Sequence, residues 1–170
     1  SMTGYQEVLT DPSYSGQLVT MTYPLIGNYG VNAEDVESDR VRVSAFIIRE
    51  YQPNHGNYRA SGSLADYLVE NKIVGVDSLD TRALTLHIRN GGAMRAVIST
   101  LETDPAALVA KARALPSMAG LDLAKTVTRQ HPYRWVDGRP QVIDTQRTPL
   151  NAHIWRERPG KLSVVAMDFG

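Results

Sequence analysis

A short, fully apolar run at residues 45–48 (AFII) is the feature that most constrains the fold of this chain. It follows residues 40–43, where arginine and valine alternate, so a half-buried strand passes into one that is apolar throughout. A strand that is apolar on both faces needs a covering layer on each side, which is typical of α/β sheets. Residues 17–23 also alternate apolar and polar side chains, which predicts a second, half-buried strand.

Three helix starts are marked by side chains that can cap a helix. Ser63 precedes Asp66 by three residues, as in a capping box, and predicts a helix from residue 64. Asp80 predicts a second helix, which the run Asn90-Gly91-Gly92 should end. Asp104 followed by Pro105 predicts a third, because proline at the first helical position loses no hydrogen bond. Helices that alternate with strands indicate an α/β fold.

Further short strands are predicted from apolar runs at residues 73–76 and 93–99. Residues 137–161 hold three prolines and many polar side chains, which indicates a linker. The apolar run at residues 162–170 then resembles a buried parallel strand, which needs neighbours on both faces. We therefore expect the sequence to be cut off where a further domain begins.

The composition limits the class of protein. With 170 residues, of which 42% are hydrophobic, the chain can bury one compact core. Eighteen basic residues balance eighteen acidic ones, so no basic surplus predicts a nucleic-acid partner. No segment combines the length and apolarity of a membrane span, and none resembles a secretory leader. We expect a soluble, cytoplasmic protein.

The residues that could carry chemistry are sparse. The chain has no cysteine, which excludes disulfides, thiolate metal sites and a cysteine nucleophile within these residues. The four histidines (His55, His87, His131 and His153) are far apart and lack nearby carboxylates at ligand spacing, so no metal site is predicted. We expect His87, on the inner side of its predicted helix, to be a core or boundary residue. No G-x-S-x-G motif marks a catalytic serine.

Two turns stand out in the first thirty residues. The run Asp11-Pro12-Ser13-Tyr14 predicts a turn in which Asp11 or Ser13 bonds to the local backbone. The pair Gly27 and Gly30 is too close for a phosphate-binding loop and lacks the Lys-Ser/Thr that would follow, so it predicts a tight turn. From the residues alone, the chain is an α/β domain without visible catalytic apparatus.

Longer stretches of sequence resemble a known family. Residues 1–17 (SMTGYQEVLTDPSYSGQ) are similar to the long signature of the carbamoyl phosphate synthetase small subunit family. An unbroken match of this length is far more specific than a short motif. The similarity returns in five further segments, at residues 22–30 (TYPLIGNYG), 80–85 (DTRALT), 92–95 (GAMR), 120–124 (GLDLA) and 164–170 (VVAMDFG).

The resemblance implies a fold and a division into domains. The family's amino-terminal domain is a swivelling β/β/α domain of three layers, here truncated before a class I glutamine amidotransferase domain. By the resemblance, residues 1–136 form that domain without its first strands, residues 137–161 form the linker, and residues 162–170 form the first strand of the amidotransferase domain. The family begins further upstream, so we expect a longer parent chain.

The resemblance also implies an activity. The complete small subunit releases ammonia from L-glutamine by means of a cysteine, a histidine and a glutamate. The large subunit, its partner in a heterodimer, uses that ammonia with bicarbonate, ATP and Mg²⁺ to make carbamoyl phosphate for arginine and pyrimidine biosynthesis. None of the three catalytic residues falls within this chain, so the resemblance implies part of a ligase that serves as scaffold, cleft wall and large-subunit interface.

One site residue is carried over from the family, namely Ser13 for glutamine binding. A hydroxyl can donate to or accept from the head group of an amino acid, so this role is chemically reasonable. The alternative is that Ser13 only holds its turn. For the chain as a whole, the alternative is a free-standing, non-catalytic binding module with the same fold. The sequence departs from the family pattern at Leu25, where histidine is usual, and at Ala96, where glycine is usual.

Overall fold

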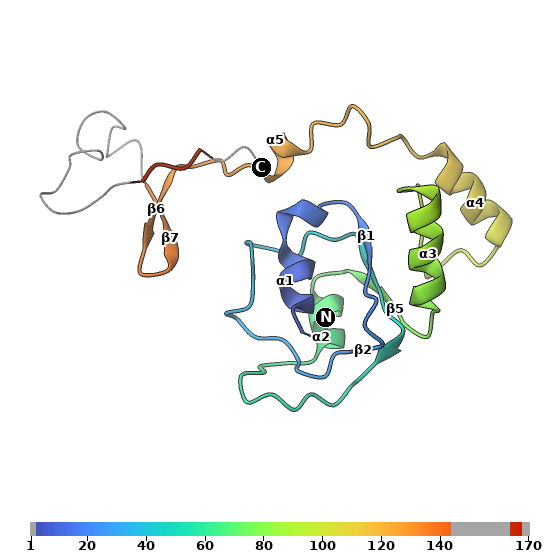
Figure 1. Ribbon diagram of the computed structural model, residues 1–170, viewed down its shortest axis with the longest axis horizontal. Coiled ribbons are helices and arrows are strands. Elements are labelled where there is room, and N and C mark those ends of the chain that lie inside the picture. Colours follow the sequence, from blue (N-terminus) through green and yellow to red (C-terminus); the bar gives the residue numbers. More distant parts are fainter. Residues whose placement is uncertain (1–2, 144–163, 168–170) are drawn as a thin grey trace, which may run out of the picture. The chain divides into compact units, whose positions relative to one another are not determined.

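The computed structural model describes residues 3–143 and 164–167 (Figure 1). The chain divides into two compact units, Ser1–Leu121 and Asp122–Gly170. In the described part, no helix is both long enough and apolar enough to cross a membrane.

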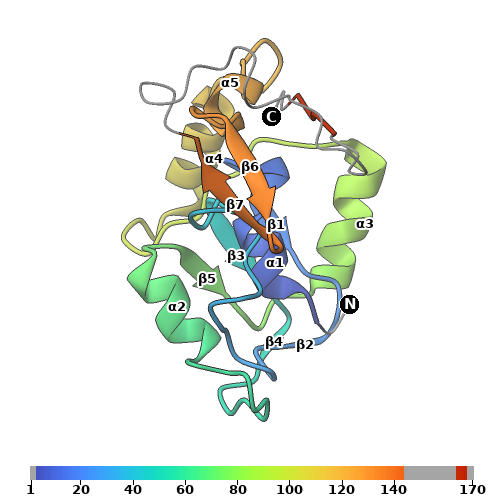
Figure 2. The ribbon, with the colours of Figure 1, turned by 90° about the vertical axis from the view of Figure 1, so that its left-hand side faces the viewer.

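A three-stranded parallel sheet forms the centre of the first unit. Its strands are β1 (Leu18–Thr20), β3 (Ala45–Ile47) and β5 (Val74–Val76), in the order β1-β3-β5. Every residue of the middle strand, β3, is buried, which confirms the prediction from the apolar run. Figure 2 shows the three strands together, with a helix beside β5. The sequence and the structure therefore agree on an α/β arrangement with parallel strands.

Two short helices pack with this sheet in a single core. They are α1 (Tyr5–Thr10) and α2 (Leu64–Glu70). Tyr5 of α1, Phe46 of β3 and Leu64 of α2 are each at most 1% exposed and belong to one apolar cluster. Full burial of a large apolar side chain is worth about 1.5–3 kcal/mol, so these contacts fix both helices on the sheet.

A second, smaller parallel pair joins β2 (Leu25–Ile26) to β4 (Glu50–Tyr51). The predicted tight turn follows β2, where the Gly30 N–H donates to the Gly27 carbonyl over 3.1 Å. Gly27 has φ +103°, and a Cβ added there would lie 2.6 Å from the carbonyl oxygen of Gln52. Glycine is required at this position by both the backbone conformation and the close approach of the neighbouring chain.

The helix starts that the sequence marks are confirmed. The helix α3 (Thr81–Gly91) begins after Asp80, whose carboxylate accepts from the Ala83 N–H over 3.0 Å. The helix α4 (Pro105–Ala114) begins with its proline, after Asp104. Local capping chemistry therefore places both starts correctly.

Two predictions for this region are wrong. Residues 93–99 form no strand, and residues 93–96 are exposed. An apolar run needs a neighbouring strand to bond with, and the described residues provide none there. His87 is exposed as well, because the inward face of α3 is formed by Thr81, Leu84 and Ile88, and His87 falls outside it.

The second unit contains the short helix α5 (Ala124–Val127) and an antiparallel hairpin of β6 (Tyr133–Val136) and β7 (Arg139–Val142). Its two turn residues, Asp137 and Gly138, both have positive φ, as a two-residue hairpin turn favours. The hairpin crosses the predicted domain limit at residue 136. Residues 164–167, the described part of the predicted buried terminal strand, form no strand and are exposed. The rest of that segment and most of the predicted linker lie outside the described residues, so the domain limits stay predictions.

Replacement of Ser63 tests its role as the cap of α2. The Ser63 hydroxyl accepts from the Asp66 N–H over 3.1 Å and donates to the Asp66 carboxylate over 2.7 Å. We expect Ser63→Ala to lower the free energy of unfolding by about 1 kcal/mol in urea titrations. Ser63→Asn keeps an oxygen acceptor and should retain most of the stability. Equal losses in the two variants would contradict the capping role.

Candidate functional site

Ser13 lies in a one-turn 3-10 helix, η1 (Pro12–Tyr14), between α1 and β1. Asp11 ends α1: its N–H still donates to the Glu7 carbonyl over 2.9 Å, but its own backbone is extended, with φ −69° and ψ 122°. Its carboxylate then accepts from the Ser13 N–H over 2.8 Å and so starts η1. The turn predicted from the sequence is therefore confirmed, and Asp11 is the residue that bonds to the local backbone.

Both backbone polar groups of Ser13 are occupied. The Ser13 carbonyl accepts from the Gln17 side-chain amide over 2.9 Å, and the Ser13 N–H donates to Asp11. The residue is exposed, and within the described residues its hydroxyl has no hydrogen-bond partner. A hydroxyl can donate one hydrogen bond and accept others. The arrangement therefore presents a free hydroxyl on a fixed backbone.

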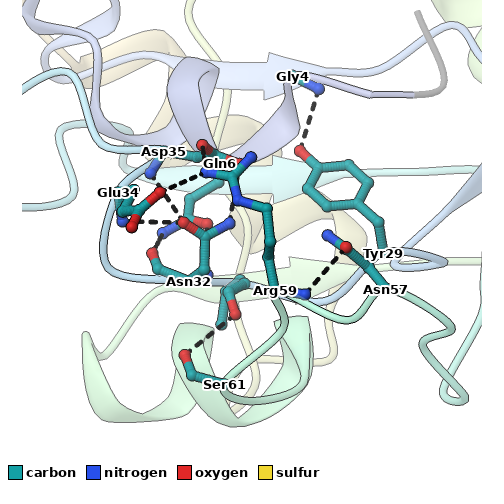
Figure 3. A network of polar contacts seen from close by, with 10 residues as sticks. Gly4, Gln6, Tyr29, Asn32, Glu34, Asp35, Asn57, Arg59 and Ser61 are labelled. Carbon is teal, nitrogen blue, oxygen red and sulfur yellow. Dashed lines mark hydrogen bonds and ion pairs between the residues drawn. The ribbon is translucent and has the colours of Figure 1, made fainter.

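The helix that leads to this turn is capped by a residue from another segment. The N-cap residue of α1, Gly4, has no side chain to offer. Instead, the Tyr29 phenol oxygen accepts from the Gly4 N–H over 3.0 Å (Figure 3). It also accepts from the Tyr5 N–H over 3.1 Å. The Tyr5 and Tyr29 rings stack with centroids 4.1 Å apart, and the Tyr5 hydroxyl donates to the Gly30 carbonyl over 2.7 Å. The cap satisfies groups that a helix start leaves unpaired.

Burial raises the pKa of both phenols. Burial is the main cause that raises the pKa of Tyr5, and proximity to Tyr29 adds to it. Burial also raises the pKa of Tyr29, with a further contribution from the negative charge of Glu7. Both hydroxyls therefore keep their protons at neutral pH, and the Tyr5 hydroxyl remains a donor to the Gly30 carbonyl.

A second set of polar contacts ties α1 to the chain after β2. The Gln6 side-chain amide donates to the Asn32 carbonyl over 2.6 Å and accepts from the Asn32 N–H over 2.9 Å. Both residues are buried, so an unpaired amide there would cost about 1–3 kcal/mol. The Asn32 side chain extends the contacts to Asp35, and Arg59 bonds to Asp35 and to Glu34 (Figure 3).

Among the described residues, Ser13 forms no hydrogen bond with a histidine, with Leu25 or with Ala96. His55, His87 and His131 are exposed, and His153 lies outside the described residues. No group of three or more histidine or acidic side chains in the described part could hold a metal ion. Leu25 is half-buried in β2, and Ala96 is exposed.

The hollow between α2 and the sheet lies elsewhere in the unit. It has a volume of about 240 Å³ and is lined by side chains such as Phe46, Leu64 and Val69, with Asp77 as the one charged residue in its lining. A free amino acid carries two charges at its head group, and an apolar lining would leave its carboxylate unpaired. The hollow therefore does not suit glutamine, and no residue of η1 lines it.

Sequence reasoning missed the contacts that support the site. Tyr29 lies 24 residues from Tyr5, and Asn32 lies 26 residues from Gln6. Capping patterns are read within a few residues, so they give no signal for a cap supplied from this distance. The density of polar and aromatic residues in the segment 28–32 (NYGVN) was the only local hint.

Comparison with known proteins gives a consistent result. The family model described as "Carbamoyl-phosphate synthase small chain, CPSase domain" matches residues 1–98. A carbamoyl phosphate synthase small chain of Syntrophotalea carbinolica is 50% identical over all of this chain and 43% of its own length. The small chain of Nitratidesulfovibrio vulgaris strain Hildenborough is 59% identical over 84% of this chain, and that of Aquifex aeolicus is 48% identical over all of it. This chain spans 38% and 44% of those two relatives.

Removal of the Tyr29 hydroxyl tests the cap on α1. We expect Tyr29→Phe to lower the free energy of unfolding by about 1–3 kcal/mol, because the ring can still stack while two backbone N–H groups lose their acceptor. Urea unfolding of the chain measures the loss. Tyr58, which is 97% exposed, supplies the control, and Tyr58→Phe should change stability by less than about 0.5 kcal/mol. Similar values for the two variants would contradict the cap.

The Asp35 contacts predict a dependence on pH. The Asn32 amide, helped by Arg59, lowers the pKa of Asp35 below the ordinary value of 3.8. A carboxyl group with a lowered pKa stabilises the folded state above its ordinary pKa, and this stabilisation is lost as the pH falls through the lowered value. We expect Asp35→Asn to lose less stability than the wild type when urea titrations at pH 7 and pH 3 are compared. An equal loss would contradict this contribution.

Proposed function

This chain belongs to the carbamoyl-phosphate synthase small chain family, and from that membership we propose that it is the amino-terminal domain of a glutamine-using small subunit. The match to the family model covers α1, η1 and the segment that caps α1, so it includes the whole surroundings of Ser13. The chain spans about two-fifths of the length of its relatives, so the activity proposed here belongs to a longer protein.

In the proposed enzyme, the small subunit releases ammonia from L-glutamine. A large subunit combines the ammonia with bicarbonate, using ATP and Mg²⁺, to form carbamoyl phosphate for arginine and pyrimidine biosynthesis in the cytoplasm. The attack on the glutamine amide requires a nucleophile such as a thiolate. This chain has no cysteine, so we assign the nucleophile to a class I amidotransferase domain outside these residues.

We further propose that the first unit takes the three-layer, swivelling β/β/α form of the family. Two features support this assignment. The first unit holds two separate groups of parallel strands, β1-β3-β5 and β2-β4, and helices pack with the first group. The proposed domain limits are residues 1–136 for the amino-terminal domain, 137–161 for the linker and 162–170 for the start of the amidotransferase domain.

The role proposed for Ser13 is to bind glutamine as part of one wall of the glutaminase cleft. The observation that carries it is the exposed hydroxyl, without a partner in the described part of the chain, on a turn whose backbone is held on both sides. Ligand sites commonly form between domains, where each domain supplies part of the lining. An exposed turn at the surface of the amino-terminal domain suits such a place.

Ser13→Ala in the full-length small chain, assembled with its large subunit, tests this role. A hydrogen bond to a charged group is worth about 1.5–3 kcal/mol, so we expect the KM for glutamine to rise about tenfold or more. The kcat should change little, because the hydroxyl takes no part in the chemical step. Carbamoyl phosphate synthesis from added ammonia should be unchanged, since ammonia bypasses the glutamine site.

The matched control is Ser117→Ala, which alters another exposed serine of the same unit. We expect it to leave the KM for glutamine at the wild-type value. An unchanged KM in Ser13→Ala, with normal folding, would refute the binding role and leave Ser13 as an ordinary residue of the turn.

A further inference from the structure

We propose that Asp11 and Gln17 are positioning residues that together orient the Ser13 hydroxyl toward glutamine. This inference rests on the proposed binding role of Ser13. It adds two residues for which the resemblance implies no role, and it follows from the hydrogen bonds on either side of Ser13.

The two side chains hold opposite ends of the same residue. The Asp11 carboxylate accepts from the Ser13 N–H over 2.8 Å, and the Gln17 amide donates to the Ser13 carbonyl over 2.9 Å. With its N–H and its carbonyl both fixed, Ser13 has a set backbone direction, and so its Cα–Cβ bond points in one direction. Only the rotation about that bond remains, which places the hydroxyl in one of three staggered positions.

The two holding residues are themselves anchored in the fold. The Asp11 N–H is bonded to the end of α1, where it donates to the Glu7 carbonyl. The Gln17 carbonyl accepts from the Ser44 N–H over 2.8 Å, next to the start of β3. Ser13 is therefore linked through Asp11 to a buried helix and through Gln17 to the central sheet.

The bonds to Ser13 are local and lie at the surface. The contacts of the Asp11 and Gln17 side chains to Ser13 are exposed, and neither residue belongs to the apolar core. Their removal should loosen η1 without unfolding α1 or β1. A change in glutamine binding would then be separable from a loss of folding.

The chain contains a matched control for the Asp11 bond. Asp104-Pro105-Ala106 repeats the pattern Asp11-Pro12-Ser13, and the Asp104 carboxylate accepts from the Ala106 N–H over 3.0 Å. Both aspartates therefore start a helix through the same type of bond, with proline as the next residue. Asp11 is followed two residues later by a hydroxyl side chain, that of Ser13, whereas Asp104 is followed by Ala106.

The experiment compares single variants of the full-length small chain assembled with its large subunit. We expect Asp11→Ala and Gln17→Met each to raise the KM for glutamine about threefold or more, with kcat and ammonia-dependent synthesis near the wild type. Asp11→Asn keeps an oxygen acceptor and should restore the KM. Asp104→Ala, the control, should leave the KM unchanged.

A double variant separates positioning from general loosening. If Asp11 acts through the Ser13 hydroxyl, Asp11→Ala should raise the KM no further once Ser13→Ala is present. A full, multiplicative increase in the double variant would overturn the inference. So would an unchanged KM in both Asp11→Ala and Gln17→Met while Ser13→Ala raises it. If Ser13→Ala itself has no effect on KM, the proposed binding role fails and the inference falls with it.

Discussion

The structure around the candidate site depends on the cap that Tyr29 places on α1. A helix of six residues is too short to be stable alone, because nucleation costs more than so few hydrogen bonds return. Two of its unpaired N–H groups find their acceptor on Tyr29, whose ring stacks on that of Tyr5. This contact sets the direction of α1, and therefore the position of Asp11 at the end of the helix.

The reciprocal amide pair of Gln6 and Asn32 makes this arrangement specific. The buried Gln6 side-chain amide meets the backbone carbonyl and N–H of Asn32 only in one relative position, so a shifted α1 would leave these groups unpaired. The apolar contacts of the core tolerate small displacements, whereas the paired amides do not. Packing therefore stabilises α1 on the sheet, and the polar pair selects the position in which it packs.

The elements that could be predicted from the sequence are those with a local cause. The apolar run at residues 45–48 and the caps at Ser63 and Asp80 each act within a few residues, and the structure bears them out. The strand predicted at residues 93–99 failed because a strand also needs a partner, which the run itself does not reveal. The Tyr29 cap was missed for the same reason, since its two halves lie far apart in the chain.

The candidate site depends both on local contacts and on contacts between distant residues. The turn at Ser13 is held by Asp11 and Gln17, which lie within four residues of it, so its cause is local. Its place on the molecule is fixed by α1 and by the distant residues that hold α1. A neutral hydroxyl on such a turn can add binding energy at little desolvation cost, but it supplies neither a nucleophile nor a base. Binding energy of this kind is uniform along the reaction, so it lowers KM and leaves the chemical step to other residues. That division of labour suits a domain that forms part of a cleft whose chemistry lies in its neighbour.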